Sequence, residues 1–112
     1  MRMLCKTTGA VTGDNGEVFF LDYYLLTKNV CVEGQSTCRY GIEICKRAKR
    51  TNGTHYMEYR KIFDLFHNES EAHEAIELMA RNIVTPLSMK DILEDMLGCT
   101  EFTDEALLVE TA

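Results

Sequence analysis

Residues 17–28 read Glu-Val-Phe-Phe-Leu-Asp-Tyr-Tyr-Leu-Leu-Thr-Lys, and this stretch decides the fold. It is rich in the aromatic and aliphatic residues that favour the pleated surface of a β-strand. Just before it, residues 13–16 read Gly-Asp-Asn-Gly, a cluster that tolerates positive φ angles and predicts a turn. We therefore expect residues 17–28 to form the second strand of an antiparallel sheet, joined by a hairpin to a first strand near residues 2–9.

The expected second strand is apolar on both of its sides. Its odd-numbered residues suffice for a core, yet Phe20, Tyr24 and Leu26 line the even-numbered side, which only Asp22 interrupts. A strand with one solvated face should be polar there. We therefore expect this second side to be covered, either by the C-terminal tail of the chain or by a second copy in a homodimer.

Two further strands follow along the chain. Residues 37–45 alternate between side chains that suit a core and side chains that suit solvent, which is typical of a half-buried strand. After a turn at residues 51–53, residues 56–66 are again rich in aromatic and aliphatic side chains. Because Lys61 interrupts one apolar side of this last strand, we expect a β-bulge near Arg60 and Lys61.

The period of the pattern then changes to that of a helix. Asn68 is a typical N-cap, and apolar residues recur at helical spacing after it. We expect Asn82 to close this helix in a left-handed conformation. A second helix begins at Thr85 or at Ser88 and ends at Gly98.

Strands that are followed by helices are typical of an α+β fold. We expect a four-stranded antiparallel meander followed by two helices packed on one face of the sheet, in a single domain over residues 1–98. The remaining residues 99–112 are acidic, and we expect an acidic C-terminal tail or a short helix that begins at Thr103.

Three short motifs carry a resemblance to a known family. They are Arg-Asn-Ile-Val-Thr-Pro at residues 81–86, Asp-Ile-Leu-Glu-Asp at residues 91–95, and Tyr-Gly-Ile-Glu-Ile at residues 40–44. Most of residues 17–97 resembles a family of small uncharacterised proteins of clostridia and other Firmicutes, known as a domain of unknown function. The resemblance implies a cytoplasmic bacterial protein, and it implies no particular activity.

The chain has 112 residues and a formal net charge of −6, which is divided unevenly. Residues 1–68 have a balance of +3, whereas residues 69–112 have a balance of −9. The overall negative charge opposes attraction to nucleic acid. The division suits recognition of a basic partner or self-association of opposite faces, with a solvated acidic helix face as the alternative. Because no apolar run approaches the roughly 18 residues of a membrane helix, we expect no membrane contact.

The chain contains five cysteines, an odd number, and none of them has Cys-x-x-Cys spacing. Cys31, Cys38 and Cys45 recur every seven residues, which is too wide for the usual ligands of one zinc ion. Residues 1–8 lack the apolar stretch of a secretory signal. We therefore expect a cytoplasmic protein with reduced thiols, and neither a metal nor another cofactor.

A basic run lies at an expected hairpin tip and consists of Lys46, Arg47, Lys49 and Arg50. Half of the twelve basic residues of the chain fall within positions 46–61. Such a hairpin suits the binding of an anion or a nucleic acid. The alternative is a charged loop that keeps the edge of the sheet soluble.

Two further groups of titratable residues lie on the expected helices. His73 lies one helical turn from Glu69 and from Glu77, a trio suited to metal binding or acid–base chemistry. We expect boundary packing for His73 and an ordinary soluble face for the second group, because a calcium loop needs a glycine turn that a helix lacks. This second group is an acidic patch on one helix: Asp91, Glu94 and Asp95.

No motif in the chain carries recognisable catalytic chemistry, since neither a nucleophile elbow nor a glycine-rich phosphate loop occurs. We therefore expect a non-catalytic protein-interaction or regulatory module that self-associates through its sheet. The first alternative is a small enzyme or ligand-binding protein with a cleft between sheet and helices. A pocket with converging histidine, cysteine and carboxylate groups would favour it. The second alternative is an anion- or nucleic-acid-binding protein that uses the basic hairpin 46–61.

Overall fold

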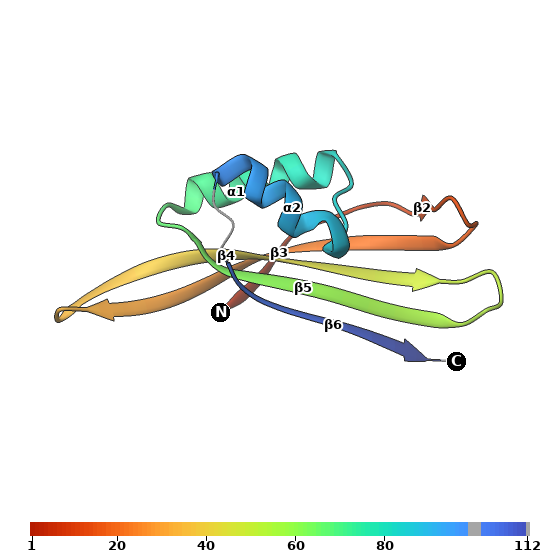
Figure 1. Ribbon diagram of the computed structural model, residues 1–112, viewed down its shortest axis with the longest axis horizontal. Helices are drawn as coiled ribbons and strands as arrows, with labels where there is room; N and C mark the ends of the chain where they lie inside the picture. Colours follow the sequence, from red (N-terminus) through yellow and green to blue (C-terminus); the bar gives the residue numbers. More distant parts are fainter. Residues whose placement is uncertain (99–101, 112) are drawn as a thin grey trace.

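The computed structural model describes residues 1–98 and 102–111, and it consists of an antiparallel sheet with two helices on one side (Figure 1). This arrangement confirms the expected α+β fold. Within the described residues, no helix has the length and apolar character that a membrane crossing requires. The elements are β1 (Arg2–Thr7), β2 (Val11–Thr12), β3 (Val18–Val32), β4 (Gln35–Lys49), β5 (His55–Phe66), α1 (Glu69–Arg81), α2 (Pro86–Leu97) and β6 (Thr103–Thr111).

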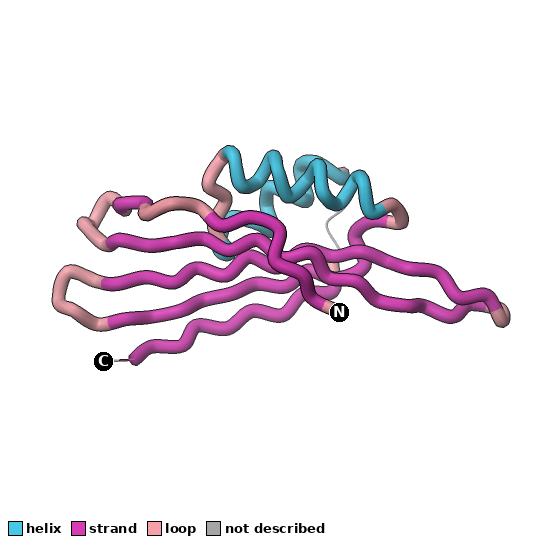
Figure 2. Tube along the Cα trace, turned by 180° about the vertical axis from the view of Figure 1, so that it is seen from behind, coloured by secondary structure: helices cyan, strands magenta, loops and turns pink. Residues whose placement is uncertain are grey.

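The strands lie in the order β1-β3-β4-β5-β6, and every neighbouring pair is antiparallel (Figure 2). The short β2 pairs with β3 farther along the edge that β1 occupies. The structure therefore has more strands than the four expected. Only β2 and β6 are additional, since β1, β3, β4 and β5 form the expected meander.

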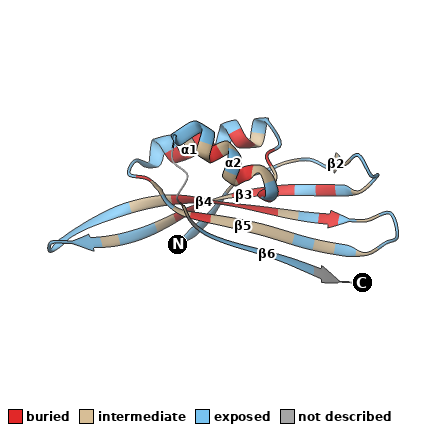
Figure 3. Ribbon diagram, viewed as in Figure 1, coloured by how far each residue is buried: buried red, intermediate tan, exposed pale blue. Residues whose placement is uncertain are grey.

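The core lies between the helices and the odd-numbered side of β3 (Figure 3). Leu21, Tyr23 and Leu25 are buried there because alternate residues of a strand point to the same face. The hydroxyl of Tyr23 donates a hydrogen bond to the carbonyl oxygen of Val84 at 2.9 Å, which satisfies the polar atom that this apolar layer buries. The helices contribute to the same core the buried residues Ala72, Ala75, Ile76, Met79, Met89 and Leu93.

The helices begin and end close to where the sequence predicts. The Asn68 side chain accepts a hydrogen bond from a backbone N–H of the first turn at 2.8 Å, so it caps α1. α2 follows Thr85 and ends at Gly98, which has a φ of 65°. The prediction for Asn82 is wrong, since its φ is −95° and Ile83 has the left-handed φ of 54°. The Asn82 side chain instead donates a hydrogen bond back to the last turn of α1.

The irregularity in β5 lies farther along the strand than the sequence predicts. Lys61 keeps a regular register with β4, and the shift falls between Ile62 and Phe66, where Asp64 has a φ of 59°. The predicted position is wrong because this side of the sheet is charged as well as apolar, and it accommodates a lysine. Gly41 lies opposite the shift, where a Cβ atom would clash with the carbonyl oxygen of Ile62.

The C-terminal segment forms a strand, which corrects the expectation of a tail or a short helix. β6 pairs with β5 along its whole length, from Thr103 opposite Phe63 to Thr111 opposite His55. The apolar run at residues 106–109 suits a helix or a strand locally, but β5 would otherwise present an unpaired edge that β6 satisfies. Because β6 extends the sheet sideways, it covers neither face of β3.

The hairpin of β3 and β4 projects beyond the rest of the molecule (Figures 1 and 2). Its turn is formed by Glu33 and Gly34, which have positive φ angles of 53° and 77°. β5 pairs with β4 only as far as Tyr40, so residues 28–39 form a two-stranded ribbon that we call the arm. The helices do not reach over the arm, and the molecule measures 54 × 25 × 24 Å.

Candidate interaction face

The side of the sheet that faces away from the helices is the candidate functional site, and we call it the open face. Cross-strand partners share a face, so the strand register identifies its members. Phe20 lies opposite Arg47, and Arg47 lies opposite Met57, which in turn lies opposite Val109. The neighbouring rows of the register add Arg2, Asp22, Tyr24, Leu26, Glu43, Cys45, Tyr59, Lys61, Glu105 and Leu107.

The structure brings Phe20, Tyr24 and Leu26 together on this face. Phe20 is 37% exposed and Tyr24 is half-buried, whereas Leu26 is buried at 8%. Further apolar side chains extend the surface across β5 and β6. They are Met57, Leu107 and Val109, which are 40%, 51% and 40% exposed. The apolar surface of the even-numbered side of β3 is therefore part of a wider face that no described segment of the chain covers.

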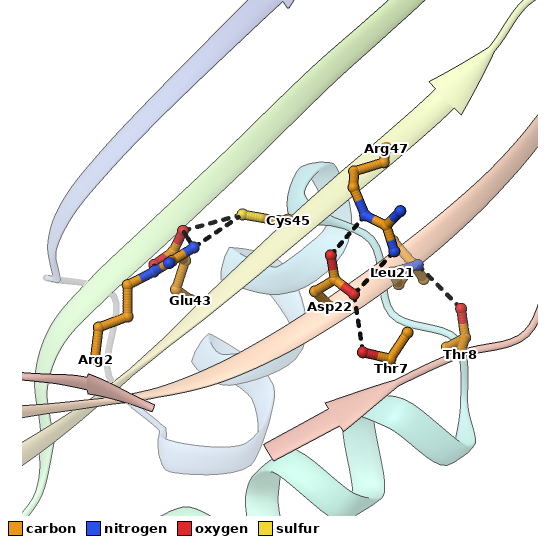
Figure 4. A network of polar contacts seen from close by, with 8 residues as sticks. All are labelled: Arg2, Thr7, Thr8, Leu21, Asp22, Glu43, Cys45 and Arg47. Atoms are coloured by element: carbon orange, nitrogen blue, oxygen red, sulfur yellow. Dashed lines mark hydrogen bonds and ion pairs between the residues drawn. The ribbon is translucent and has the colours of Figure 1, made fainter. Parts of the chain in front are cut away.

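Two ion pairs lie between the apolar residues of the open face (Figure 4). In the first, Arg2 on β1 reaches across β3 to Glu43 on β4, with Nε 2.6 Å from Oε1 and Nη2 3.1 Å from Oε2. The Arg2 guanidinium also lies 3.5 Å from the centre of the Tyr24 ring, a cation–π contact. Glu43 is only 2% exposed, so the arginine and the tyrosine shield this carboxylate from solvent.

The second ion pair joins Arg47 on β4 to Asp22 on β3. The Arg47 Nε atom lies 2.7 Å from Oδ2 of Asp22, and Thr7 donates a hydrogen bond to Oδ1 at 2.9 Å. Burial opposes ionisation of Asp22, but the hydrogen bonds from Arg47 and Thr7 outweigh it and lower the pKa of this carboxyl. Asp22 therefore stays ionised. Its pairing with Arg47 explains why a charged residue is tolerated in the apolar row of β3.

Cys45 lies between the two ion pairs and is buried. Its thiol donates a hydrogen bond to Oε2 of Glu43 at 3.0 Å. Burial and this carboxylate raise the pKa of Cys45 to about 12. The thiolate is the reactive form of cysteine, so Cys45 is unreactive at neutral pH and acts as a small packing residue.

Three adjoining depressions make a trough along the open face. The largest of the three, about 690 Å³, lies near the end of β4 and the beginning of β5 and is lined by Phe20 and Val109. A second, of about 370 Å³, lies over Tyr24 and shares Arg47 and Met57 with the first. A third, of about 300 Å³, shares Arg2 and Lys61 with the second. The open face is thus hollowed rather than flat, and side chains of a partner can enter it.

The basic run does not form one surface. β4 continues to Lys49, so the run lies within a strand rather than at a hairpin tip, and alternate residues point to opposite sides. Lys46 is on the helix side, where its Nζ lies 3.0 Å from Oε1 of Glu17, whereas Arg47 is on the open face. The Arg50 guanidinium lies 4.5 Å from the centre of the Tyr56 ring. Strand alternation therefore divides the candidate anion-binding residues that the sequence groups together.

The acidic patch remains on the polar side of α2. Asp91 and Asp95 are exposed and Glu94 is half-buried, facing away from the core residue Leu93. Among the residues that the structure describes, no three histidine, cysteine or carboxylate side chains gather as ligands for a metal ion. The patch therefore contributes charge to the helix side, opposite the open face.

Arg2 and Glu43 are members of the site that the sequence did not predict. They are 41 residues apart, and Arg2 reaches its partner across an intervening strand. A signal was present in the sequence, since Glu43 lies between two isoleucines and Asp22 lies in an apolar row. An acidic residue in such a setting predicts a buried cation partner, although the sequence does not say which one.

Comparison with known proteins identifies a family for this chain and gives no activity. The matching family model is described as Family of unknown function (DUF6514), and it matches residues 2–99, from β1 to just beyond α2. No curated protein and no solved structure matches the chain. Because the match covers most of the 112 residues, the chain belongs to this family of unknown function.

Proposed function

We propose that this chain is a self-associating interaction module, in which the open face packs against the same face of a second copy. The observation that carries the proposal is the composition of this face. Half-exposed apolar side chains surround two arginine–carboxylate pairs that are already neutralised within the chain. A face of this kind loses little when water leaves it, because burying a charge is expensive chiefly when it has no partner.

The balance of charge favours a second copy over a strongly charged partner. Asp22 is paired with Arg47, and Glu43 is paired with Arg2, so neither carboxylate is left to repel its counterpart across a symmetric interface. A nucleic acid would have to compete with these carboxylates for both arginines. Two copies related by a twofold axis present the same surface to each other, which suits a nearly neutral, apolar patch.

The size of the open face also fits a dimer. Five strands about 4.8 Å apart span roughly 24 Å, and about nine residues of strand span roughly 30 Å, so each copy offers about 700 Å². A standard interface buries about 800 Å² on each partner. Two such sheets pack face to face about 10 Å apart with interdigitated side chains, and the trough provides room for Phe20 and Met57 of a second copy.

Light scattering coupled to gel filtration tests the dimer at about 50 µM chain, a concentration at which ordinary micromolar affinities are visible. We expect the mass of a dimer for the natural chain and of a monomer for Phe20→Asp, which buries a charge in the interface. Leu87→Asp is the matched control, since Leu87 is a 76% exposed apolar residue on α2, and this variant stays dimeric. Circular dichroism confirms that all three chains are folded.

A monomeric natural chain at this concentration contradicts the proposal. A dimeric Phe20→Asp chain, or a monomeric Leu87→Asp chain, places the interface elsewhere and also contradicts it.

We also propose that the protein works in the cytoplasm of a bacterium of the clostridial or wider Firmicutes type, as the family resemblance implies. The free thiols of Cys5, Cys31, Cys38 and Cys45 support a reducing compartment. A membrane-impermeant maleimide applied to intact cells of the native host should leave the exposed Cys31 and Cys38 unlabelled, and should label them after lysis. Labelling before lysis would contradict a cytoplasmic location.

A further inference from the structure

On the helix side, the structure brings a cysteine of β1 beside a histidine and a carboxylate of α1. The Cys5 Sγ atom lies 4.0 Å from Nδ1 of His73, and Nε2 of His73 lies 3.4 Å from Oε1 of Glu69. The order thiol, imidazole, carboxylate is the order of a nucleophile, its base and the group that orients the base. The carbonyl oxygen of Met3 lies 3.6 Å from the same Sγ atom and is a second acceptor within reach of the thiol hydrogen.

A β-bulge places Cys5 and Lys6 together on the helix side of β1. In β1, Leu4 lies opposite Tyr24 and Lys6 lies opposite Tyr23, so Cys5 is the extra residue between them. Met3 pairs with the core residue Leu25, so alternation directs Cys5 to the helix side, where it packs at the margin of the core beside α1. The bulge brings Lys6 to this side as well. His73 and Glu69 are four residues apart on α1 and therefore share one face of that helix.

The thiol opens into a small cavity between β1 and α1. The cavity has a volume of about 320 Å³, and its lining includes Cys5, His73, Ile76, Lys6 and Glu77. It offers a nucleophile, an apolar wall, one cation and one anion. This combination matches a small zwitterionic molecule, whose carboxylate would face Lys6 and whose ammonium group would face Glu77.

The other described cysteines have different surroundings. Cys38 is exposed on the arm and lies 3.1 Å from Oδ1 of Asn29, and Cys31 is exposed near the arm's turn. Cys45 is buried against Glu43. Cys5 is the one that the structure places beside an imidazole and a cavity, which separates it chemically from an ordinary surface thiol.

We propose that Cys5, His73 and Glu69 form a site for thiol–disulfide exchange. The substrate is the disulfide of a small zwitterionic aminothiol, such as cystine, and the product is a mixed disulfide on Cys5. This site lies on the helix side of the sheet and does not depend on the proposed self-association. Exchange requires no oxidant other than the small disulfide itself.

The step balances in atoms and electrons. Nδ1 of His73 accepts the thiol proton as Cys5 Sγ attacks one sulfur of the disulfide and forms a new S–S bond. The old S–S bond breaks, and its electron pair leaves with the second sulfur, which takes the proton and departs as a free thiol. Cys5 sulfur is oxidised, and the departing sulfur is reduced. Glu69 stabilises the imidazolium that forms in between.

The histidine is needed because Cys5 is not activated on its own. Burial raises the pKa of the Cys5 thiol, and the charge of Glu69 raises it further, whereas Lys6 and a backbone hydrogen bond act in the opposite direction. The resting group is therefore a thiol rather than a thiolate. A base that removes the proton during attack can contribute about 100-fold to the rate.

The experiment measures the rate at which cystine modifies Cys5, by mass spectrometry of the intact chain with Cys31, Cys38 and Cys99 replaced by serine. Cys99 lies outside the described residues and is replaced only to remove its thiol. We expect a single cysteinyl adduct at Cys5. We also expect a rate about 100-fold lower in His73→Gln, and about 10-fold lower in Glu69→Gln. His73→Ala should be partly rescued by added imidazole, which a merely structural role for His73 would not allow.

Ligand chemistry is tested with two related disulfides. Cystamine lacks the carboxylates of cystine and dithiodipropionate lacks its ammonium groups, so both should react more slowly than cystine. Lys6→Ala should abolish the advantage of cystine over cystamine. The proposal is overturned if Cys5 reacts no faster than Cys31 in the natural chain, or if His73→Gln, still folded by circular dichroism, reacts at the unchanged rate.

Discussion

The two sides of one sheet bury their residues by different means. On the helix side, Leu25 and Ile44 are buried by two helices that contribute apolar residues of their own. On the open face, Glu43 is equally buried, but a long side chain from another strand and an aromatic ring cover it. Burial on the first side comes from a second layer, whereas burial on the second comes from side chains that lie flat on the sheet.

This contrast explains how a strand can be apolar on both sides in a chain of this length. Both helices lie on one side of the sheet, whereas the side chains of Arg2 and Arg47 lie over the centre of the other side. Arginine suits this role because its apolar stem covers neighbouring residues while its planar guanidinium pairs with a carboxylate. The margins of the open face, at Phe20 and Leu107, are left exposed.

The largest effect should come from opening a cavity on the helix side. Leu25→Ala removes a side chain that is 2% exposed, and we expect the free energy of unfolding to fall by about 3 kcal/mol. Denaturant titration of both chains at one concentration measures this difference. Leu87→Ala, on the exposed surface of α2, should change the free energy by less than about 0.5 kcal/mol. Equal losses in the two variants would contradict the assigned core.

A smaller effect should come from breaking the Arg2–Glu43 pair on the open face. Arg2→Met leaves a buried carboxylate without its cation, and we expect a loss of about 2 kcal/mol. The loss is below that of a fully buried pair because the Arg2 side chain is 46% exposed and solvent screens part of the interaction.

The control for this pair is a double variant. Combining Arg2→Met with Glu43→Leu removes both charges, so most of the stability should return. A double variant that loses the full sum of the two single losses would show that the pair is not what covers this face.

The smallest effect should be a fall in the free energy of unfolding at acidic pH. The pKa of Asp22 is lower in the folded chain than its ordinary value of 3.8, so the folded state binds fewer protons in acid than the unfolded state. Its contribution is present above about pH 4 and is lost as the pH falls through the folded pKa. Unfolding curves between about pH 2 and pH 6 measure this.

The Asp22→Asn chain isolates the contribution of Asp22, because Glu17 on the helix side also has a lowered pKa and contributes in the same direction. The natural chain should lose more stability below pH 4 than Asp22→Asn loses. Identical acid profiles for the two chains would show that Asp22 does not contribute to the loss of stability in acid.

Local patterns were enough to predict most of this fold. The alternation along β3 and β4 identified the buried side, and Asn68 and Gly98 marked helix ends because capping chemistry acts within a few residues. β6 could not be predicted in this way. Its apolar run has no preference strong enough to exclude a helix, and the edge of β5 that decides its structure lies about 40 residues away in sequence.

The residues of the candidate sites were even harder to predict from local patterns. Phe20 and Tyr24 were identified because their neighbours along β3 reveal the surplus apolar side. The pairing of Arg2 with Glu43, and of Cys5 with His73, depends on which strands and helices lie side by side. A bulge of one residue in β1 then brings Lys6 to the same side as Cys5, and no periodic pattern contains that information.

The arm increases the apparent hydrodynamic size of this molecule in solution. The radius of gyration is 15.1 Å, compared with about 13 Å for a compact domain of this length, so friction is larger than the mass alone implies. A single chain therefore elutes early from a gel-filtration column, and the elution volume by itself imitates an assembly. Tumbling is also anisotropic, because rotation about the 54 Å axis is faster than rotation of that axis end over end. The N–H bonds of β3 and β4 are perpendicular to these strands and lie across the long axis, so these amide groups should relax differently from amide groups whose N–H bonds lie along that axis.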